Sequence, residues 1–381
     1  MAGPRGLGLE RVFVSILKVY SDPGNLVLVL GTSSKEEEYF ISQLESLDVK
    51  PLPKVITSEL SVNERQLVYL DGGVIFASSR ILVTDFLLNR IPSEHITGIL
   101  VYKAHKVVES GQEAFILRLF RIRNKTGFIK AFSSSPVSFT AGFCHVNRVM
   151  RSLFVRNLYL WPRFHKDVSD CLNQCKPEVI ELQLKQTPAM LSIQTACLDL
   201  IHYSTKELKK TNPSLDLEDI SVEAALSKSF HKILQLQLEP VWHQLSSKTR
   251  QLVADLKTLR TILVQKFEFL VNRIKTEETV SNPRLIVHPL QVIADPFALT
   301  KLLYTYKPDT IIMYDADLSF VRQVEVYQAT NCEIPVRVYF MIYNGSSEEQ
   351  SYLTTLRREK EAYEMLIKEK AVCCLLFFIY V

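Results

Sequence analysis

The sequence lacks acidic residues over one long stretch. From Ala114 to Lys166 it contains no aspartate or glutamate. The whole chain of 381 residues has a net charge of only +4, yet this stretch contributes +10, so the remainder sums to −6. A local excess of arginine and lysine is typical of a surface that binds phosphates, and the alternative is a basic face turned to solvent. The basic residues of the stretch are Arg118, Arg121, Arg123, Lys125, Lys130, Arg148, Arg151, Arg156, Arg163 and Lys166.

The sequence also lacks the spacing of a zinc site. Its seven cysteines form no Cys-x2-Cys pair matched by a second Cys or His pair. Cys171 and Cys175 lie four residues apart, as neighbours on a helix do, and we interpret them as buried thiols. An odd number of cysteines and no signal peptide favour a reducing compartment, the cytosol or the nucleus. The longest apolar run, AVCCLLFFIYV at the end, is about half of the ~20 residues that a membrane span needs, so no membrane partner is expected.

A third absence is that of a phosphate loop. Such a loop has the form Gly-x4-Gly-Lys-Ser/Thr and follows a strand, so that backbone N–H groups surround the phosphates. The nearest candidate is GPRGLGLE, in which Gly3 and Gly8 have the correct spacing. Leu9 and Glu10 stand where the lysine and the hydroxyl are needed. Only two residues precede the motif, so we expect no strand to lead into it.

The run GILVYKAHKV resembles a second ATPase motif with its acids replaced. Helicases of superfamily 2 end this motif in Asp-Glu-Ala-His, whose carboxylates serve Mg²⁺ and the attacking water. Here Tyr102 and Lys103 precede Ala104 and His105. The sequence therefore predicts no ATP hydrolysis. The alternative is an ordinary core strand with a histidine at its exit.

Strand and helix patterns alternate near both ends of the chain. NLVLVL, GGVIFAS, ITGILVY and GFIKAFSSSP predict strands, and SSKEEEYFISQL predicts a helix that begins with a capping box from Ser33 to Glu36. From Val149 to about Glu278 we expect helices without strands, one of them starting at Thr187-Pro188. RLIVHPL, TIIMYD and VRVYFMIY then predict a second parallel lobe. The predicted domains are a first lobe over residues 1–148, a helical domain over 149–278, a partial second lobe over 279–371 and a hydrophobic tail over 372–381.

Long runs of the chain resemble the XPF (xeroderma pigmentosum group F) repair endonucleases and their archaeal helicase-nuclease relatives. The runs include LVLVLGTSSKEEEYFISQL, GGVIFASSRILVTDFLLNRIPSEHITGILVYKAHKVVESGQEAFILRLFR and GFCHVNRVMRSLFVRNLYLWPRF, and they cover most of residues 5 to 371. The resemblance implies two RecA-like parallel-sheet lobes of a degenerate superfamily 2 helicase with an inserted all-helical domain. It also implies a nuclear protein of nucleotide excision repair and interstrand crosslink repair.

The sequence departs from this family in what makes the family an enzyme. The nuclease pattern Gly-Asp…Glu-Arg-Lys-x3-Asp is missing, because Glu-Arg occurs only at Glu10 and Glu64 and no lysine follows either pair. We therefore expect no cofactor in this chain, and Mg²⁺ or Mn²⁺ only in a nuclease domain. The tandem helix-hairpin-helix module that binds the small non-catalytic partner subunit is also missing. We expect a splice form or an incomplete sequence, whose last ten residues look foreign to the family.

Three functions remain open at this point. The first is an ATPase-inactive part of a repair nuclease that binds branched or single-stranded DNA and repair scaffold proteins. The second is an active junction endonuclease, which would rely on Asp315 and Asp317. The third is a non-functional or inhibitory truncated isoform. For the first, the expected DNA contacts are the ten basic residues above and Arg80, which matches the DNA-contact motif of helicases. Interleaved aromatic residues could stack on unpaired bases, although we expect most of them in the core: Phe115, Phe120, Phe128, Phe132, Phe143, Phe154, Tyr159, Trp161 and Phe164.

Overall fold

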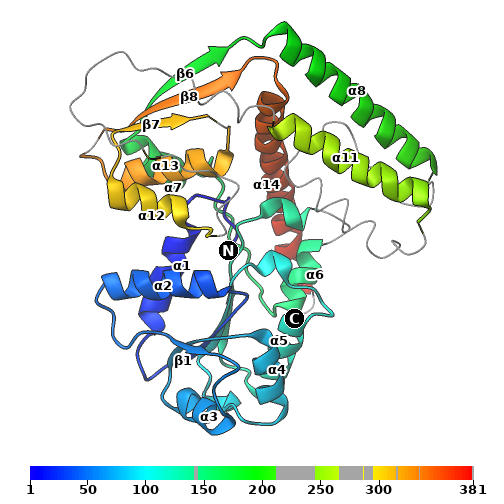
Figure 1. The fold of residues 1–381 in the computed structure, drawn as a ribbon. Helices are drawn as coiled ribbons and strands as arrows, with labels where there is room; N and C mark the ends of the chain where they lie inside the picture. The colour runs from blue at the N-terminus through cyan, green and yellow to red at the C-terminus, as the bar shows by residue number, and fades with distance from the viewer. Residues whose placement is uncertain are drawn as a thin grey trace.

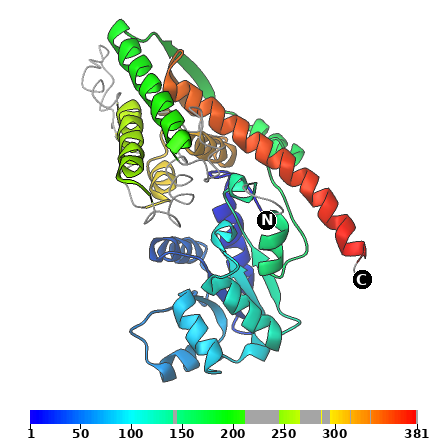
Figure 2. The ribbon, with the colours of Figure 1, turned by 90° about the vertical axis from the view of Figure 1, so that its right-hand side faces the viewer.

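The structure is a computed structural model that describes residues 1–140, 145–211, 245–265, 286, 295–314, 316–333 and 335–379. Within these residues the chain forms two parallel sheets flanked by helices, and a pair of long helices lies beyond the second sheet (Figure 1). One further helix, α14 (Ser347–Ile379), runs from the second sheet along the first lobe, as its orange-to-red ribbon shows in Figure 2. The predicted division into two α/β lobes is confirmed.

The first sheet has five parallel strands in the order β2-β3-β1-β4-β5. All four predicted strands of this lobe are present. The additional strand, β2, is only three residues long, and its short length explains why no apolar run marks it. The strands are β1 (Leu26–Leu30), β2 (Lys54–Ile56), β3 (Gly73–Ala77), β4 (Gly98–Val101) and β5 (Phe128–Ala131).

The central strand β1 supplies both cores of the first lobe. Leu26, Leu28 and Leu30 point into one core, whereas Val27 and Val29 point into the other, and none is more than 4% exposed. A parallel strand with both faces buried needs helices on both faces. The core around Val27 and Val29 is completed by α1 (Leu9–Tyr20) and α2 (Ser34–Ser46). The core around the three leucines is completed by α3 (Val62–Leu70), α4 (Ser79–Leu87), α5 (Gln112–Arg123) and α6 (His145–Ser152).

The second sheet has three described parallel strands in the order β6-β8-β7. They are β6 (Glu178–Leu184), β7 (Thr310–Met313) and β8 (Arg337–Tyr343). Ile311 and Val338 face a small core that α12 (Ala298–Tyr306) and α13 (Leu318–Thr330) complete. The predicted strands TIIMYD and VRVYFMIY are confirmed, and RLIVHPL lies outside the described residues except for Ile286.

Strand β6 corrects the prediction that residues 149–278 contain only helices. Its register with β8 runs from Glu178 opposite Arg337 to Leu184 opposite Tyr343. The strand is largely exposed, with Val179 at 59%, so it lacks the continuous apolar run of a doubly covered strand. Its only described partner is far away in sequence, and local pattern carries no information about such pairing.

The predicted boundary of the first lobe at residue 148 is also wrong. Val149, Met150 and Leu153 are buried in the core of the first lobe, and Leu160 still pairs with Ala2. Helix α7 (Lys166–Gln174) and β6 then lead into the second lobe. The predicted helical domain is represented by α8 (Pro188–Thr211), which begins where Thr187-Pro188 predicted, and by α11 (Ser247–Gln265), which lies beside it (Figure 1).

Helix α14 links the two lobes. It begins beside the second sheet, yet Leu366 is buried in the core of the first lobe, where the helix packs against the short turn η3 (Pro136–Phe139). Within the second lobe, Arg322 of α13 forms a two-point ion pair with Glu359 of α14, and one of its bonds is 2.7 Å long. The remaining short turns are η1 (Ser93–His95) and η2 (Ala104–Lys106).

A disulfide joins the end of α7 to the segment after α13. Cys175 at the end of α7 forms a disulfide with Cys332, which follows α13, and Cys171 is exposed. The interpretation of Cys171 and Cys175 as buried thiols is therefore wrong, because α7 ends where the chain leaves α13 rather than inside a core.

Among the described helices, none combines the length and the apolar character needed to cross a membrane.

A buried carboxylate holds α3 and α4 together. Asp85 of α4 is fully buried and accepts hydrogen bonds from the guanidinium of Arg65 at 3.0 and 3.1 Å and from the hydroxyl of Tyr69 at 3.0 Å. Arg90 adds a longer contact of 3.4 Å. Burial raises the pKa of Tyr69, with the negative charge of Asp85 as a second cause, so the hydroxyl stays a donor.

We predict that Asp85→Ala lowers the free energy of unfolding by about 3–5 kcal/mol, because it leaves a half-buried guanidinium and a buried hydroxyl without their acceptor. The matched control is Asp71→Ala, which removes a carboxylate that is 67% exposed and pairs with Lys54 at 2.9 Å. The control should cost less than about 1 kcal/mol. Urea unfolding of both variants measures the difference, and equal losses would contradict the prediction.

Candidate nucleic-acid interface

The first residues of the chain lie beside the end of β5 and the segment before α7. Ala2 forms parallel bridges to Ser133, beyond the end of β5, and to Leu160. Its N–H donates to the carbonyl of Tyr159 at 2.8 Å, and the N–H of Gly3 donates to the carbonyl of Ser133 at 3.0 Å. Ala2 is a single bridging residue outside the strands, so no strand leads into the motif, as expected.

The loop between Ala2 and α1 turns tightly against the second lobe. Gly6 and Gly8 both have left-handed backbones, with φ of 88° and 76°. A Cβ at Gly6 would lie 2.6 Å from the carbonyl oxygen of Ser319 in α13, so only glycine allows this approach. The space in front of the loop is therefore occupied by protein from the other lobe.

The two replaced loop residues now belong to the fold. Leu9 is 5% exposed and packs in the core with Phe13, so it is unable to reach a phosphate. Glu10 lies in the first turn of α1. Burial raises the pKa of Glu10, a backbone hydrogen bond and the charge of Arg5 oppose this with smaller effects, and the charge of Glu36 adds a still smaller increase. A carboxyl group at this place disfavours a bound phosphate.

Tyr102 and Lys103, which stand in place of the two acids, also form contacts inside the protein. The ring of Tyr102 is buried against Phe13 and Phe40, with ring centroids 4.9 and 5.3 Å away, and burial raises its pKa. Lys103 has a left-handed backbone, and its ammonium lies 2.6 Å from Oε2 of Glu36. That same carboxylate caps α2 by accepting the N–H of Ser33 at 2.9 Å. The site therefore offers a ring and a paired ammonium where Mg²⁺ would need carboxylates.

The Ala-His pair keeps a contact between two motif positions. The N–H of Ala104 donates to the carbonyl of Phe132 at 2.7 Å, and Nδ1 of His105 lies 2.8 Å from the hydroxyl of Ser133. The predicted second motif and the Ser-rich end of β5 are thus joined directly. Both lie at the carboxyl edge of the parallel strands, where ligands of such sheets bind.

Aromatic residues form contacts between the two lobes. Phe297, just before α12, is 4% exposed and stacks on Tyr39 of α2 with ring centroids 3.8 Å apart. Arg11 of α1 bonds the hydroxyl of Tyr304, and its guanidinium lies 4.9 Å from the centre of that ring. Among the residues described, no group of three or more His, Cys, Asp or Glu side chains is placed to hold a metal ion.

The basic stretch divides into two groups in the structure. The first group has partners inside the protein. Arg163 forms two bonds of 3.1 and 3.0 Å to Glu325 of α13, and Arg121 donates to the carbonyl of Gly127 at 2.7 Å. Lys130 donates to the hydroxyl of Tyr20 at 2.6 Å on the other face of the sheet. These three side chains stabilise the fold, although the sequence predicted them as DNA contacts.

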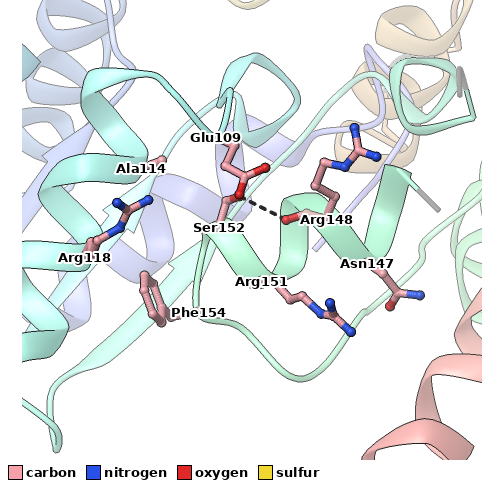
Figure 3. Close-up of a pocket in the computed structure, with 8 residues that line it drawn as sticks. All are labelled: Glu109, Ala114, Arg118, Asn147, Arg148, Arg151, Ser152 and Phe154. Atoms are coloured by element: carbon pink, nitrogen blue, oxygen red, sulfur yellow. Dashed lines mark hydrogen bonds between the residues drawn. The ribbon is translucent and has the colours of Figure 1, made fainter. Parts of the chain in front are cut away.

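The second group is exposed, and three of its members surround one pocket. Arg118 of α5 and Arg148 and Arg151 of α6 line a cavity of about 530 Å³. Figure 3 shows the guanidinium groups of Arg118 and Arg148 on opposite sides of Glu109. The other predicted basic contacts are exposed but do not line this pocket: Arg80, Arg123, Lys125, Arg156 and Lys166.

The sequence did not predict every residue of the pocket. Glu109 precedes the acid-free stretch, and Asn147 and Ser152 carry no charge that would have marked them. Their spacing was a usable signal, because Asn147 and Arg151, like Arg148 and Ser152, lie four residues apart on one helix. Phe154 was predicted only as one of several aromatic residues, of which the structure buries some, such as Phe120 and Phe132, and exposes others, such as Phe115 and Phe164. Ala114 completes the lining.

Comparisons with known proteins agree on one family. The chain is 35% identical over 599 residues to the DNA repair endonuclease XPF of Cricetulus griseus, covering 96% of this chain and 66% of that protein. This alignment is longer than the chain's 381 residues, so parts of the hamster protein have no counterpart here. The chain is 48% identical over 286 residues to the DNA repair endonuclease XPF of Drosophila melanogaster, covering 73% of this chain and 29% of that protein. No family model matches.

A solved structure supports the fold. The helicase domain of Hef from Pyrococcus furiosus matches with a TM-score of 0.51 at 16% identity, covering 93% of this chain and 94% of that one. At this identity the match concerns the fold alone, and it identifies the two parallel-sheet lobes as RecA-like. The chain spans just under two thirds of the length of the hamster relative. The sequence matches show that the chain belongs to the XPF family of DNA repair endonucleases.

Proposed function

We propose that this chain is an ATPase-inactive, DNA-binding platform of a nuclear DNA repair nuclease. The observation that carries the proposal is the basic pocket, where Arg118, Arg148 and Arg151 stand exposed around one cavity. Exposed guanidinium groups bind phosphate oxygens in pairs and hold a strand in register without reading its sequence. The relatives are named DNA repair endonucleases, which supports DNA as the ligand.

The rigid contact between the lobes supports a platform rather than a motor. A helicase motor opens and closes its cleft around ATP, and this requires the two lobes to separate. Here Phe297 is stacked in the cleft, Gly6 touches α13, and Arg163 is paired with Glu325 across the lobes. Such contacts favour one fixed arrangement, which suits a surface that positions DNA and partners.

The two other functions receive less support. An endonuclease would need its paired acids free to hold a metal, but the carboxylate of Asp317 accepts the N–H of Phe320 at 3.0 Å and caps α13. Asp315 lies outside the described residues. For an inhibitory isoform, the relevant surface is α8, where Leu191, Leu200 and Tyr203 are 53%, 51% and 65% exposed. We assign the binding of repair scaffold proteins to this helix, and that assignment suits the platform as well as an inhibitor.

We predict that the chain neither binds nor hydrolyses ATP. Restoring the acids with the double substitution Tyr102→Asp and Lys103→Glu should not create activity, because Leu9 and Glu10 still replace the loop lysine and hydroxyl. Binding of a fluorescent ATP analogue and release of phosphate measure both properties, with an active superfamily 2 helicase as the positive control. Turnover that survives a second purification step would overturn the prediction.

We predict that Arg148→Ala and Arg151→Ala each weaken binding to branched or single-stranded DNA and reduce the log–log slope of affinity against salt by up to about one unit. The matched control is Arg163→Ala, because that arginine is paired with Glu325. It should leave the salt slope unchanged and lower the melting temperature instead, by about 2–4 °C for each kcal/mol lost.

Fluorescence anisotropy over a series of salt concentrations, together with thermal unfolding, gives both quantities for all three variants. If Arg148→Ala and Arg151→Ala lower the melting temperature and leave the slope unchanged, the basic surface holds the fold together and the DNA assignment fails.

A further inference from the structure

The pocket is larger than a phosphate requires. Its volume of about 530 Å³ lies within the ~300–1,000 Å³ of cavities that hold small organic ligands, a size class that includes one nucleotide. Its chemistry is mixed, since three guanidinium groups, one carboxylate, one amide and one ring line it. A phosphate alone would use the guanidinium groups and leave the ring and the carboxylate without a role.

Three positive charges face this space without an acidic partner in the described part of the chain. The ion pairs that the structure contains include none with Arg118, Arg148 or Arg151, although Glu109 lines the same cavity. In Figure 3 the guanidinium groups stand apart around the pocket instead of converging on the carboxylate. The cavity therefore carries a net positive charge.

The backbone forces an aromatic ring to the rim of the pocket. Helix α6 ends with the N–H of Val155 bonded to the carbonyl of Met150 and the N–H of Phe154 bonded to the carbonyl of Arg151, both at 3.0 Å. This pattern places a left-handed residue, usually glycine, after the helix. Here that residue is Phe154, with φ of 54° and a side chain that is 41% exposed.

The neighbours of Phe154 explain why the ring points outward. Leu153 is 3% exposed in the first-lobe core, and Val155 packs against the same core. With both neighbours directed inward, the ring of Phe154 is left at the surface beside Arg118 and Arg151 (Figure 3). A bulky residue in a left-handed conformation is unfavourable for folding, and such strain gathers at binding sites.

We propose that this pocket takes one unpaired nucleotide of the bound DNA, with its phosphate between the guanidinium groups of Arg148 and Arg151 and its base against the ring of Phe154. The carboxylate of Glu109 can accept a hydrogen bond from an exocyclic amine of the base. A base inside a duplex is stacked and out of reach, so the pocket selects single-stranded or splayed DNA. This inference rests on the proposed function, because it names the part of the DNA that the basic surface holds.

The surroundings favour a strand over a free nucleotide. Exposed Arg156 lies close enough to Arg121 of α5 to help lower the pKa of Arg121, after burial as the larger cause. Exposed Arg123 and Lys125 stand at the end of the same helix. Basic residues thus continue beyond the pocket along α5, where a strand would place further phosphates and a single nucleotide would place none.

The test uses Phe154→Gly, because glycine suits the left-handed backbone and spares the fold. The full chain is titrated with a single-stranded oligonucleotide that carries 2-aminopurine at one position, and with a blunt duplex. Phe154→Gly should weaken binding to the single strand by about 5- to 150-fold, the range for loss of one base–aromatic stack, and leave duplex binding and the salt slope unchanged. The fluorescence change of 2-aminopurine on binding should also be lost.

Matched controls make each outcome decisive. Tyr159→Ala removes an aromatic side chain that is 57% exposed and does not line the pocket, and it should leave both affinities unchanged. An equal loss with this control, an equal loss on the duplex, or no loss with Phe154→Gly overturns the inference while DNA binding itself stands. Displacement of the oligonucleotide by dAMP at lower concentration than by the unlabelled strand would assign the pocket to a free nucleotide and also overturn it. If the unmodified chain binds no DNA, the proposed function fails first.

Discussion

The structure depends on the burial of strand β1 on both faces. Each of its residues is directed into one of two apolar cores, and burial of such side chains is the main favourable contribution to folding. Because the strand is parallel to both of its neighbours, the carboxyl ends of β1, β4 and β5 lie at one edge. That edge carries the motif remnants, and its position would be the same whether or not the motifs were active. The fold of the first lobe therefore sets the place of this edge independently of the residues that occupy it.

Contacts inside the protein also explain which residues stand at the motif positions. A phosphate site in an open cleft needs exposed backbone amides and cations that are free to meet an anion. In this chain the ammonium of Lys103 neutralises Glu36, the ring of Tyr102 fills a core, and Phe297 from the second lobe stacks on Tyr39. Each replacement turns a group that would bind a ligand into one that binds the protein.

Much of the first lobe could be predicted because its signals are local. Continuous apolar runs marked β1, β3 and β4, and the capping box from Ser33 to Glu36 marked the start of α2. The errors concern contacts between distant residues. Strand β6 pairs with β8, which follows the two long helices in the sequence. Arg163 is paired with Glu325, 162 residues later, and because composition does not reveal this partner, the arginine was predicted as a DNA contact. Arg148 and Arg151 are exposed, but placing them around one pocket with Arg118 requires knowing that α5 and α6 pack together.

The pairing of β6 with β8 also sets an order of folding during synthesis. The sheet of the first lobe and most of its core come from residues 2 to about 160, so this part is able to fold before β6 is made, and Phe297 and Leu366 join its cores later. Strand β6 is able to pair only after β8 has emerged from the ribosome, because Glu178 lies opposite Arg337. The entropy lost in closing so long a loop slows this pairing further. In that interval the apolar side chains of β6 are exposed along an unpaired edge, which is a template for wrong association. The second lobe is therefore the part of this protein that stays open to wrong association for longest during its synthesis.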